Sequence, residues 1–291
     1  MSSPHPAADS VLTRRRFLLG TATAAAAMTL YAGEVARHEL DVVRRTIQIP
    51  SLPDAFHGYR IVQISDIHLD EFTEPSFLQH TVHRINELQP DVVLITGDFV
   101  TQGAFTFVSA RHAAYRAAEI LAGLQAPERY AVLGNHDVTV GSAMVTDALT
   151  ASGTPVLTNR YIPLERRGGR VWLAGIDDPN TSHPNLDLAL PARPNAPILL
   201  MSHGPDFTDT ILQHPRGKYV DLVLAGHSHG GQVDLPFLGP LVLPPGGKLY
   251  PHGYYRFGRT QLYVNRGLGT VGVPFRFNCP PEITVLTLQG A

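Results

Sequence analysis

Five short apolar runs of the chain each lead into a histidine, an aspartate or an asparagine. Each run holds about four β-favouring residues and is bounded by glycine or small polar residues, as expected for a strand buried on both faces. The polar residues that follow the runs at 61–64, 92–95, 130–133, 198–201 and 222–225 are, in order, Asp66 and His68, Asp98, Asn135 and His136, His203, and His227 and His229. Any fold of this chain must bury the five runs and accommodate the polar side chains that follow them.

Two stretches with helical spacing separate the first three runs. Apolar residues recur at helical intervals over 75–88 and over 109–124, and Pro127 follows the second stretch closely. The order strand, helix, strand, helix, strand is typical of a parallel sheet. Functional crevices of such sheets lie at the carboxyl ends of the strands. We therefore expect the polar residues that end the five runs to meet in one place.

The residues expected to meet there are typical metal ligands. They comprise two aspartates, one asparagine and five histidines. So many polar groups are not expected to share one crevice unless metal ions hold them together. Neutral imidazole and carboxylate oxygen favour Mn, Fe, Zn or Co. Because one ion takes about four protein ligands, the excess predicts two divalent transition-metal ions.

The composition agrees with a metal site of this kind in an ordinary globular protein. The chain has 291 residues, of which 44% are hydrophobic and 16% charged. Its formal charge of -2 gives no reason to expect a nucleic acid partner. Histidine is abundant, with 14 residues, whereas Cys279 is the one cysteine, which excludes an intramolecular disulfide.

The N-terminal segment 1–36 is interpreted as an export signal or an N-terminal anchor. The paired Arg14 and Arg15 precede Phe17 and Leu18, and a mildly apolar stretch follows. This order resembles a twin-arginine export signal. The alternative is an N-terminal membrane anchor, although the apolar stretch is short for the ~20 residues that span a bilayer. We expect the twin-arginine machinery to deliver the protein to the periplasm, the outer face of the cytoplasmic membrane or the cell wall, with the signal either cleaved or kept.

The remaining residues, 37–291, contain no repeat and no low-complexity linker, so we expect one domain. The motifs within it are Asp66-x-His68, Gly97-Asp98, Gly134-Asn135-His136-Asp137, His203 and Gly226-His227-x-His229. In order and separation they resemble the calcineurin-like metallophosphoesterase superfamily. The arginine pair, the run 226–232 and the tail with 265–267 and 275–276 resemble its bacterial branch of exported phosphodiesterases. The resemblance implies an α/β fold, a four-layer α/β/β/α sandwich with two mixed sheets and the site at the edge between them.

The resemblance also implies a role for each polar residue. The ligands of the first metal would be Asp66, His68 and His229, those of the second Asn135, His203 and His227, and the bridge between them Asp98. His136 would not bind metal but would face the substrate. Asp137 beside it would either orient the ring of His136 or cap the loop.

In-line hydrolysis of a phosphodiester agrees with such a site. Two divalent ions, two aspartates and a bridging hydroxide leave a formal charge of about +1, which matches a singly anionic diester. The ions would lower the pKa of the bridging water towards ~7, so that hydroxide attacks the phosphorus. His136 would stabilise the phosphoryl group or protonate the leaving oxygen.

Several alternatives stay open at this point. At the positions of Thr101 and Gln102, Ser/Thr protein phosphatases resemble a motif with an Asp-Arg pair. The arginine that grips a phosphomonoester there is therefore absent from this chain. Arg266 is predicted either to bind the substrate phosphate or to form a structural ion pair. A hydrolase of a nucleotide-linked lipid pyrophosphate or of a cyclic nucleotide is the runner-up. A metal-binding scaffold without activity is the alternative that is not an enzyme.

The proline-rich segment 235–245 follows the last cluster directly and is almost wholly apolar. It is predicted either to contact a lipid tail or the membrane surface, or to form a hairpin that covers the second sheet, and we prefer the hairpin. The expected partners are thus a phosphodiester substrate and the export machinery. If the segment binds lipid, the substrate is expected to be lipid-linked and a membrane surface becomes a further partner.

Overall fold

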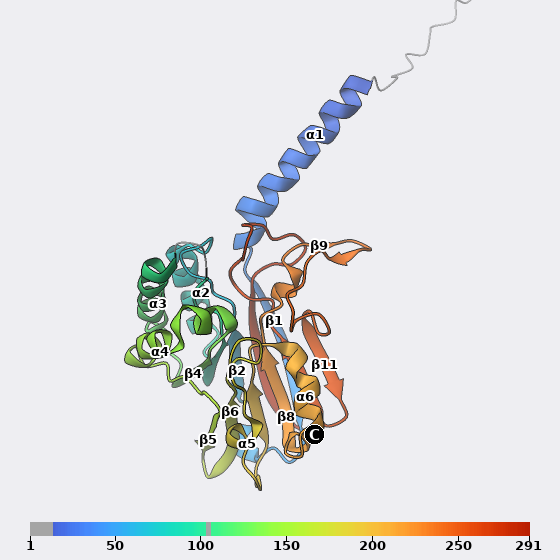
Figure 1. Ribbon diagram of the computed structural model, residues 1–291. Helices are drawn as coiled ribbons and strands as arrows, with labels where there is room; N and C mark the ends of the chain where they lie inside the picture. Colours follow the sequence, from blue (N-terminus) through green and yellow to red (C-terminus); the bar gives the residue numbers. More distant parts are fainter. Residues whose placement is uncertain (1–13, 103–105) are drawn as a thin grey trace, which may run out of the picture.

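The computed structural model describes residues 14–102 and 106–291 and folds them around two mixed β-sheets (Figure 1). The strands are β1 (Asp41–Ile49), β2 (Arg60–Ile64), β3 (Val92–Thr96), β4 (Glu128–Val132), β5 (Arg160–Arg166), β6 (Gly169–Gly175), β7 (Ile198–Met201), β8 (Val220–Ala225), β9 (Asp234–Leu235), β10 (Gly239–Pro240), β11 (Gly253–Phe257), β12 (Thr260–Val264) and β13 (Glu282–Gly290). The first sheet has the order β1-β13-β2-β3-β4 and the second the order β11-β12-β8-β7-β6-β5. All five predicted runs are strands.

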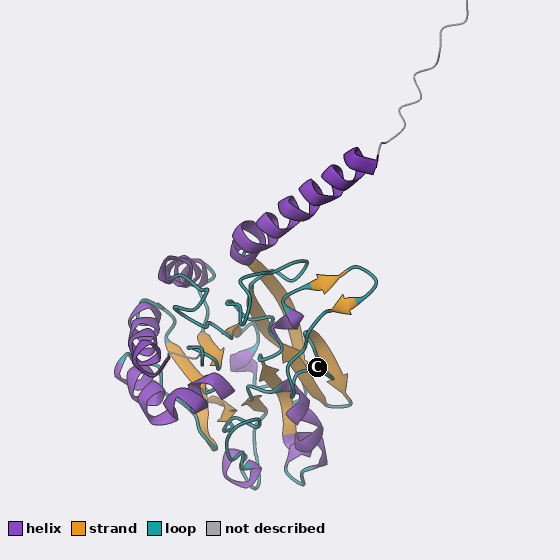
Figure 2. Ribbon diagram, turned by 45° about the horizontal axis from the view of Figure 1, so that its top comes forward, coloured by secondary structure: helices purple, strands orange, loops and turns teal. Residues whose placement is uncertain are grey.

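Helices lie on the outer faces of both sheets (Figures 1 and 2). The helices are α1 (Arg14–Leu30), α2 (Pro75–Glu87), α3 (Thr106–Leu121), α4 (Asn135–Ala151), α5 (Leu186–Ala189) and α6 (Thr208–Gln213). The two predicted helices, α2 and α3, pack with α4 against the first sheet, and the short α5 and α6 pack against the second. The helices α4, α5 and α6 were not predicted.

Three hydrophobic clusters fill the spaces between four layers. Successive side chains of a strand point to opposite faces, so each strand serves two clusters. In β2, Ile61 packs between the sheets whereas Val62 packs against the helices. In β8, Leu224 packs between the sheets whereas Val223 faces the outer side of the second sheet. The predicted four-layer sandwich with two mixed sheets is therefore confirmed.

The directions of the strands bring the polar residues to one edge. β2, β3 and β4 run parallel in the first sheet, and β6, β7, β8 and β12 run parallel in the second. The antiparallel partners are β13 beside β2, β5 beside β6 and β11 beside β12. Because parallel strands end at the same edge, the segments that follow β2, β3, β4, β7 and β8 can form a single site.

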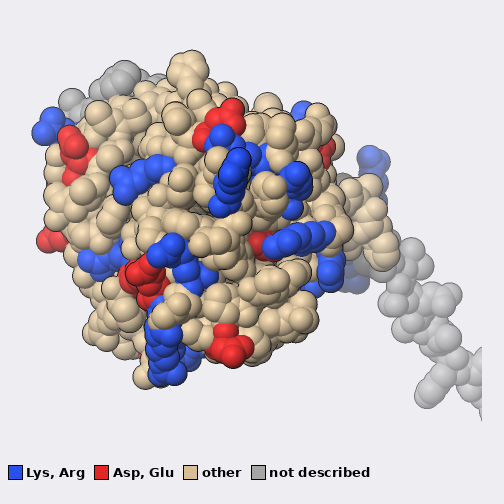
Figure 3. Space-filling view, turned by 90° about the horizontal axis from the view of Figure 1, so that it is seen from below, with Lys and Arg blue, Asp and Glu red and all other residues tan. Residues whose placement is uncertain are grey.

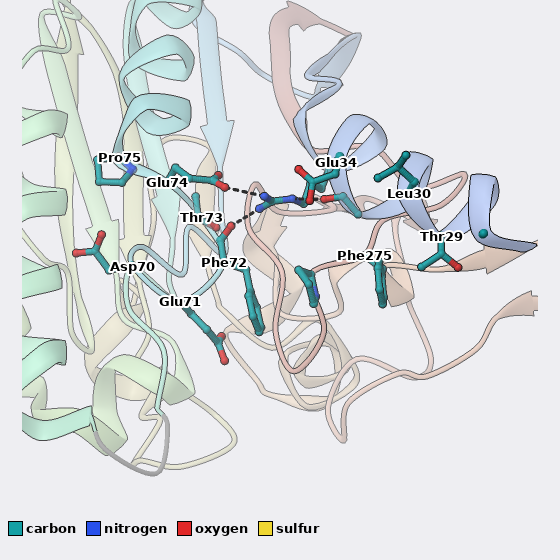
Figure 4. A pocket seen from close by; sticks show the side chains of 14 residues that line it. Thr29, Leu30, Glu34, Asp70, Glu71, Phe72, Thr73, Glu74, Pro75 and Phe275 are labelled. Carbon is teal, nitrogen blue, oxygen red and sulfur yellow. Dashed lines mark hydrogen bonds and ion pairs between the residues drawn. The ribbon is translucent and has the colours of Figure 1, made fainter.

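The N-terminal helix α1 projects from the domain, and none of its residues is buried (Figure 1). The turns that follow it dock on the domain, where Ala32 and Ala36 are buried. The guanidinium of Arg37 ties these turns down through an ion pair with Glu74 at 2.7 Å and a hydrogen bond to the carbonyl of Phe72 (Figure 4). Among the described helices, none combines the length and the apolarity that a bilayer span requires.

The proline-rich segment does not do what we expected of it. β9 and β10 pair only with each other, and the turn between them exposes Phe237 and Leu238. The prediction that this segment covers the second sheet is therefore wrong for its tip. The local sequence predicts a hairpin but not the direction in which the hairpin points.

Candidate metal centre

All the predicted histidine and aspartate ligands lie together at the carboxyl ends of the strands. Ligand atoms within 4.8 Å of one another form three groups, namely Asp66 with His68 and His229, His68 with Asp98 and His136, and Asp98 with His203 and His227. His68 and Asp98 each belong to two groups, so the three groups form one continuous cluster. Except for His136, every member is buried.

Left-handed turns carry most of these side chains. The φ angles are 51° at Asp66, 47° at His68, 56° at Asp98, 68° at His227 and 53° at His229. Residues other than glycine seldom adopt this conformation, which costs on the order of 1–3 kcal/mol each. The surrounding structure holds the turns in place, so that two ligands can leave a single strand end and face the same point.

Two glycines of the motifs allow ligand loops to touch, one between the two sheets and one within the first sheet. A Cβ atom on Gly226 would lie 1.9 Å from Oγ of Ser65 and 2.4 Å from Oδ2 of Asp66. On Gly134 it would lie 2.2 Å from Oδ1 of Asp98. Any side chain at these positions would push the ligand loops apart, which explains why glycine precedes the ligands there.

Hydrogen bonds behind the cluster fix the orientation of two imidazoles. Nδ1 of His203 lies 2.7 Å from the carbonyl oxygen of Thr96, and Nε2 of His227 lies 2.8 Å from that of Pro245. Because a carbonyl only accepts, each of these nitrogens carries the ring proton and donates it. The other nitrogens, Nε2 of His203 and Nδ1 of His227, then face each other at 3.2 Å.

The donor set fits divalent metal. Nitrogens that face each other this closely require a proton or a cation between them, and Nε2 atoms of His68 and His229 show a second such approach at 3.1 Å. Oδ1 of Asn135 is buried without a hydrogen-bond partner among the described residues. A buried acceptor in that state costs about 1–3 kcal/mol unless a bound ligand satisfies it. Imidazole, carboxylate and amide oxygen are the ligands that such ions prefer.

The electrostatics of the cluster favour the same ligand. Burial lowers the pKa of His68 and of His229 well below the usual value for histidine, so both rings stay neutral, the form that binds metal. At His203 burial acts against the proton, but the Asp98 carboxylate, 3.1 Å from Nε2, outweighs it and raises the pKa of the ring. Burial also opposes ionisation of Asp98, yet His203 in turn lowers the pKa of that carboxyl. A cation bound here would displace the proton of His203.

Comparison with known proteins decides the family. The family model described as "Calcineurin-like phosphoesterase" matches residues 59–231. The chain belongs to this family. That match includes every predicted metal ligand, from Asp66 to His229.

Three relatives cover nearly the whole chain. The chain is 36% identical to "Uncharacterized metallophosphoesterase YkuE" of Bacillus subtilis, over 96% of this chain and 98% of that protein. It is 28% identical to "Phosphodiesterase YaeI" of Escherichia coli, over 96% of this chain and 100% of that protein. It is also 28% identical to "UDP-2,3-diacylglucosamine pyrophosphatase LpxG" of Chlamydia trachomatis, over 92% of this chain and 95% of that protein.

Within this calcineurin-like phosphoesterase, Asp137 caps a loop. Its carboxylate accepts hydrogen bonds from the backbone N–H groups of Asp98 at 2.8 Å, Phe99 at 2.9 Å and Gly134 at 3.0 Å. These bonds join the loop after β3 to the start of α4. Both carboxylate oxygens are thus engaged by backbone, which is the second of the two roles expected for Asp137, rather than orientation of His136.

Arg266 forms a structural ion pair. Its Nε lies 2.5 Å from Oε2 of Glu282 and its Nη2 lies 2.8 Å from Oδ2 of Asp41. Because carboxylates engage Nε and Nη2 of the guanidinium, the structure supports the ion pair rather than the alternative in which Arg266 binds the substrate phosphate.

Arg276, which belongs to the tail at 275–276, has a role in the structure that its sequence pattern did not indicate. Its guanidinium is fully buried and donates to the carbonyls of Arg266, Gly267, Gly269 and Cys279. The loop so fixed runs beside the first ligands, because the backbone N–H of Gly269 donates to the carbonyl of Asp66 at 2.7 Å. Arg276 therefore positions the loop that supports Asp66.

A cavity of about 500 Å³ opens beside the cluster. Part of its wall is formed by residues of the cluster, including Asp98, Asn135, His136, His227 and His229. The apolar wall of the cavity includes Val233, Leu241, Val242, Pro244, Val271 and Val273. A ligand of this cavity would meet both the polar groups of the cluster and aliphatic side chains.

Asp137→Ala should lower the free energy of unfolding by at least about 2 kcal/mol, because it leaves buried backbone N–H groups without acceptors. Urea unfolding measures this loss, and metal content should fall with it. Asp147→Ala, an exposed change on the same helix, should stay within about 0.5 kcal/mol of the parent. Unchanged stability and metal content with loss of activity alone would instead assign Asp137 to catalysis.

Proposed function

We propose that the protein is a dinuclear metal phosphodiesterase. The observation that carries this proposal is the position of Asp98, whose carboxylate lies within reach of histidines from two ligand groups. Nε2 of His203 lies 3.1 Å and Nε2 of His68 3.7 Å from Oδ2 of this carboxylate. A single buried carboxylate between two histidine groups suits a bridge between two ions better than a ligand of one.

The proposed division of ligands follows the first and the third of the three groups of side chains. The first ion would be held by Asp66, His68 and His229, the second by Asn135, His203 and His227, and both by Asp98. Asn135 is assigned to the second ion because its orphaned Oδ1 needs a partner and its residue lines the cavity with Asp98 and His227. When bound, two divalent ions would activate a water molecule for in-line attack and polarise the phosphoryl group.

His136 is proposed to serve the substrate rather than a metal. Its Nδ1 accepts a hydrogen bond from the backbone N–H of Gln102 at 2.8 Å. The proton of the neutral ring is therefore on Nε2, where it can be donated. Because His136 also lines the cavity, this proton is available to a phosphoryl oxygen or to the leaving oxygen.

The cavity favours a diester with an apolar substituent. Among the described residues that line it, none is Lys or Arg, so no guanidinium or ammonium balances the second charge of a phosphomonoester. The apolar wall suits an acyl chain or another aliphatic group. The relative named as a phosphodiesterase supports the reaction, and the one named for a diacylated nucleotide sugar supports a nucleotide-linked lipid pyrophosphate as the second candidate.

We also propose that the protein acts outside the cytoplasm after export by the twin-arginine route. The support is the pair Arg14 and Arg15 at the start of α1, followed by exposed apolar residues. In this proposal the protein works in the periplasm, at the outer face of the cytoplasmic membrane or in the cell wall.

Asp98→Ala should abolish hydrolysis and remove both ions, because no neighbouring carboxylate can replace one that serves two ions. Elemental analysis of the purified protein should find close to two transition-metal ions per chain in the parent and almost none in the variant. The matched control Asp147→Ala should keep both. Active parent protein without metal would contradict the dinuclear mechanism.

His136→Asn should keep the metal content and slow hydrolysis by ~10²–10⁴-fold, the usual contribution of a positioned proton donor. The loss should be smallest for diesters with a p-nitrophenolate leaving group, which needs little protonation, and largest for alkoxides. His112→Asn, an exposed change on α3, serves as the control. Loss of metal would make His136 a ligand, and an equal loss across the series would leave it a phosphate-binding residue.

Replacing Arg14 and Arg15 by Lys should block export although the charge is kept, because Lys lacks the planar guanidinium fork. Cell fractionation followed by immunoblotting should find the variant inside the cytoplasm. A normal yield of this variant outside the cytoplasm would rule out the twin-arginine route.

A further inference from the structure

The hairpin β9–β10 exposes a patch of large apolar side chains beside the metal centre. Phe237 is fully exposed, Leu238 is 78% and Val242 76% exposed. Leu241 next to them is more than half exposed. Single exposed apolar residues are common, but several in one short segment mark an interaction surface.

The turn of the hairpin holds Phe237 outward at a conformational cost. Phe237 has a φ of 69°, in the left-handed region that bulky residues avoid. The hydrogen bond from the N–H of Leu238 to the carbonyl of Leu235, at 3.1 Å, closes the turn. The exposed aromatic ring gains no packing within the domain that would offset this cost.

The same segment reaches the metal centre on its inner side. Leu241 and Val242 belong both to the exposed patch and to the apolar wall of the cavity, together with Val233. Val273, 46% exposed, extends the patch from the loop opposite. An apolar path therefore runs from the hairpin tip into the cavity.

The hairpin and the N-terminal helix stand at the same end of the molecule (Figures 1 and 2). The short segment 276–277 forms backbone hydrogen bonds at the base of both. The N–H of Arg276 donates to the carbonyl of Ala32 just after α1, at 3.1 Å, and the N–H of Asp234 in β9 donates to the carbonyl of Phe277, at 3.0 Å. α1 itself exposes apolar side chains, such as Phe17, Met28 and Leu30, along its length.

The shape of this end favours a lipid surface over a protein partner. A protruding tip and an isolated helix present convex apolar surfaces. A bilayer can accept both together, whereas a protein partner would need two separate grooves to receive them. The opposite face carries basic residues interspersed with acidic ones, as expected for a surface that stays in water (Figure 3).

We propose that the hairpin tip, with Phe237, Leu238, Leu241, Val242 and Val273, inserts into the apolar layer of a lipid membrane. The cavity would then open at the membrane surface, where the apolar part of a substrate can enter along the path described above. Aromatic and aliphatic side chains of this kind bind membranes in proportion to the apolar area they bury. The proposal concerns docking and does not depend on the proposed hydrolysis.

The test places an indole at the tip of the full-length protein. Phe237→Trp is combined with Trp172→Phe, which removes the one native tryptophan. Vesicles of phosphatidylethanolamine and phosphatidylglycerol should shift its emission to the blue, and brominated acyl chains should quench it. Leu188→Trp in the same background, on α5 and exposed, should show neither effect.

Three results would overturn the proposal. The protein could fail to float with the vesicles. It could float, through α1, while the indole at position 237 is neither shifted nor quenched. The emission could also shift with protein concentration in the absence of lipid, which would make a second copy of the chain the occupant of the patch. None of these readouts requires hydrolysis, so failure of docking is distinguishable from failure of the proposed function.

A second variant separates docking from the integrity of the site. Phe237→Ser with Leu238→Ser should weaken vesicle binding by roughly tenfold or more, because each side chain buries an apolar area of substantial transfer free energy. Hydrolysis of a soluble diester should be unchanged, since neither residue lines the cavity. A parallel loss of soluble-diester hydrolysis would show that the tip supports the site rather than docks on lipid.

Discussion

The buried carboxylate of Asp98 is the constraint around which the metal centre is built. An isolated charge at 1% exposure would be very costly, so the surrounding groups must compensate it. The N–H of His136 donates to Oδ1 at 2.9 Å, and the ring of His203 lies against Oδ2. These groups come from both sheets and from the first turn of α4. The junction of the two sheets and the position of the charge therefore depend on each other, and a bound cation would complete the compensation.

Two further buried charges act on backbone rather than on ligands. Asp137 collects N–H groups from the loop after β3 and from the start of α4, and Arg276 collects carbonyls from the loop beside Asp66. Burial and the charge of Asp98 raise the pKa of Asp137 to about 8, whereas the hydrogen bonds from backbone N–H groups favour its carboxylate form. The guanidinium of Arg276 is satisfied by charge-assisted hydrogen bonds to carbonyls. Loops that must hold left-handed residues such as His229 need this support, since local preference acts against the conformation.

The apolar runs and their polar ends allowed five strands and two helices to be predicted, because burial on both faces leaves a local signature. The four layers were implied by the resemblance to the family and not by these runs. Long-range pairing left no such signature. β1 and β13 lie side by side although most of the chain separates them, and the ion pair of Arg266 with Asp41 depends on that pairing. Helix α4 was missed because its first residues, from Asn135, have the composition of a loop. Gly134 serves as its N-cap, and the helix starts within the ligand motif itself.

The two walls of the cavity make different demands on a substrate. A small hydrophilic diester would satisfy His136 and the metal ligands but would leave Val233 and Val271 against water, with no gain from the apolar area. A substrate with an aliphatic part beside its phosphate covers both walls, and the free energy from burying that part contributes to binding. Such molecules are held in membranes. Since Leu241 and Val242 belong to both the cavity wall and the exposed patch, the same side chains that would recognise the apolar part would also meet the surface from which it comes. Selection of the substrate and placement of the enzyme at that surface would therefore rest on one short segment.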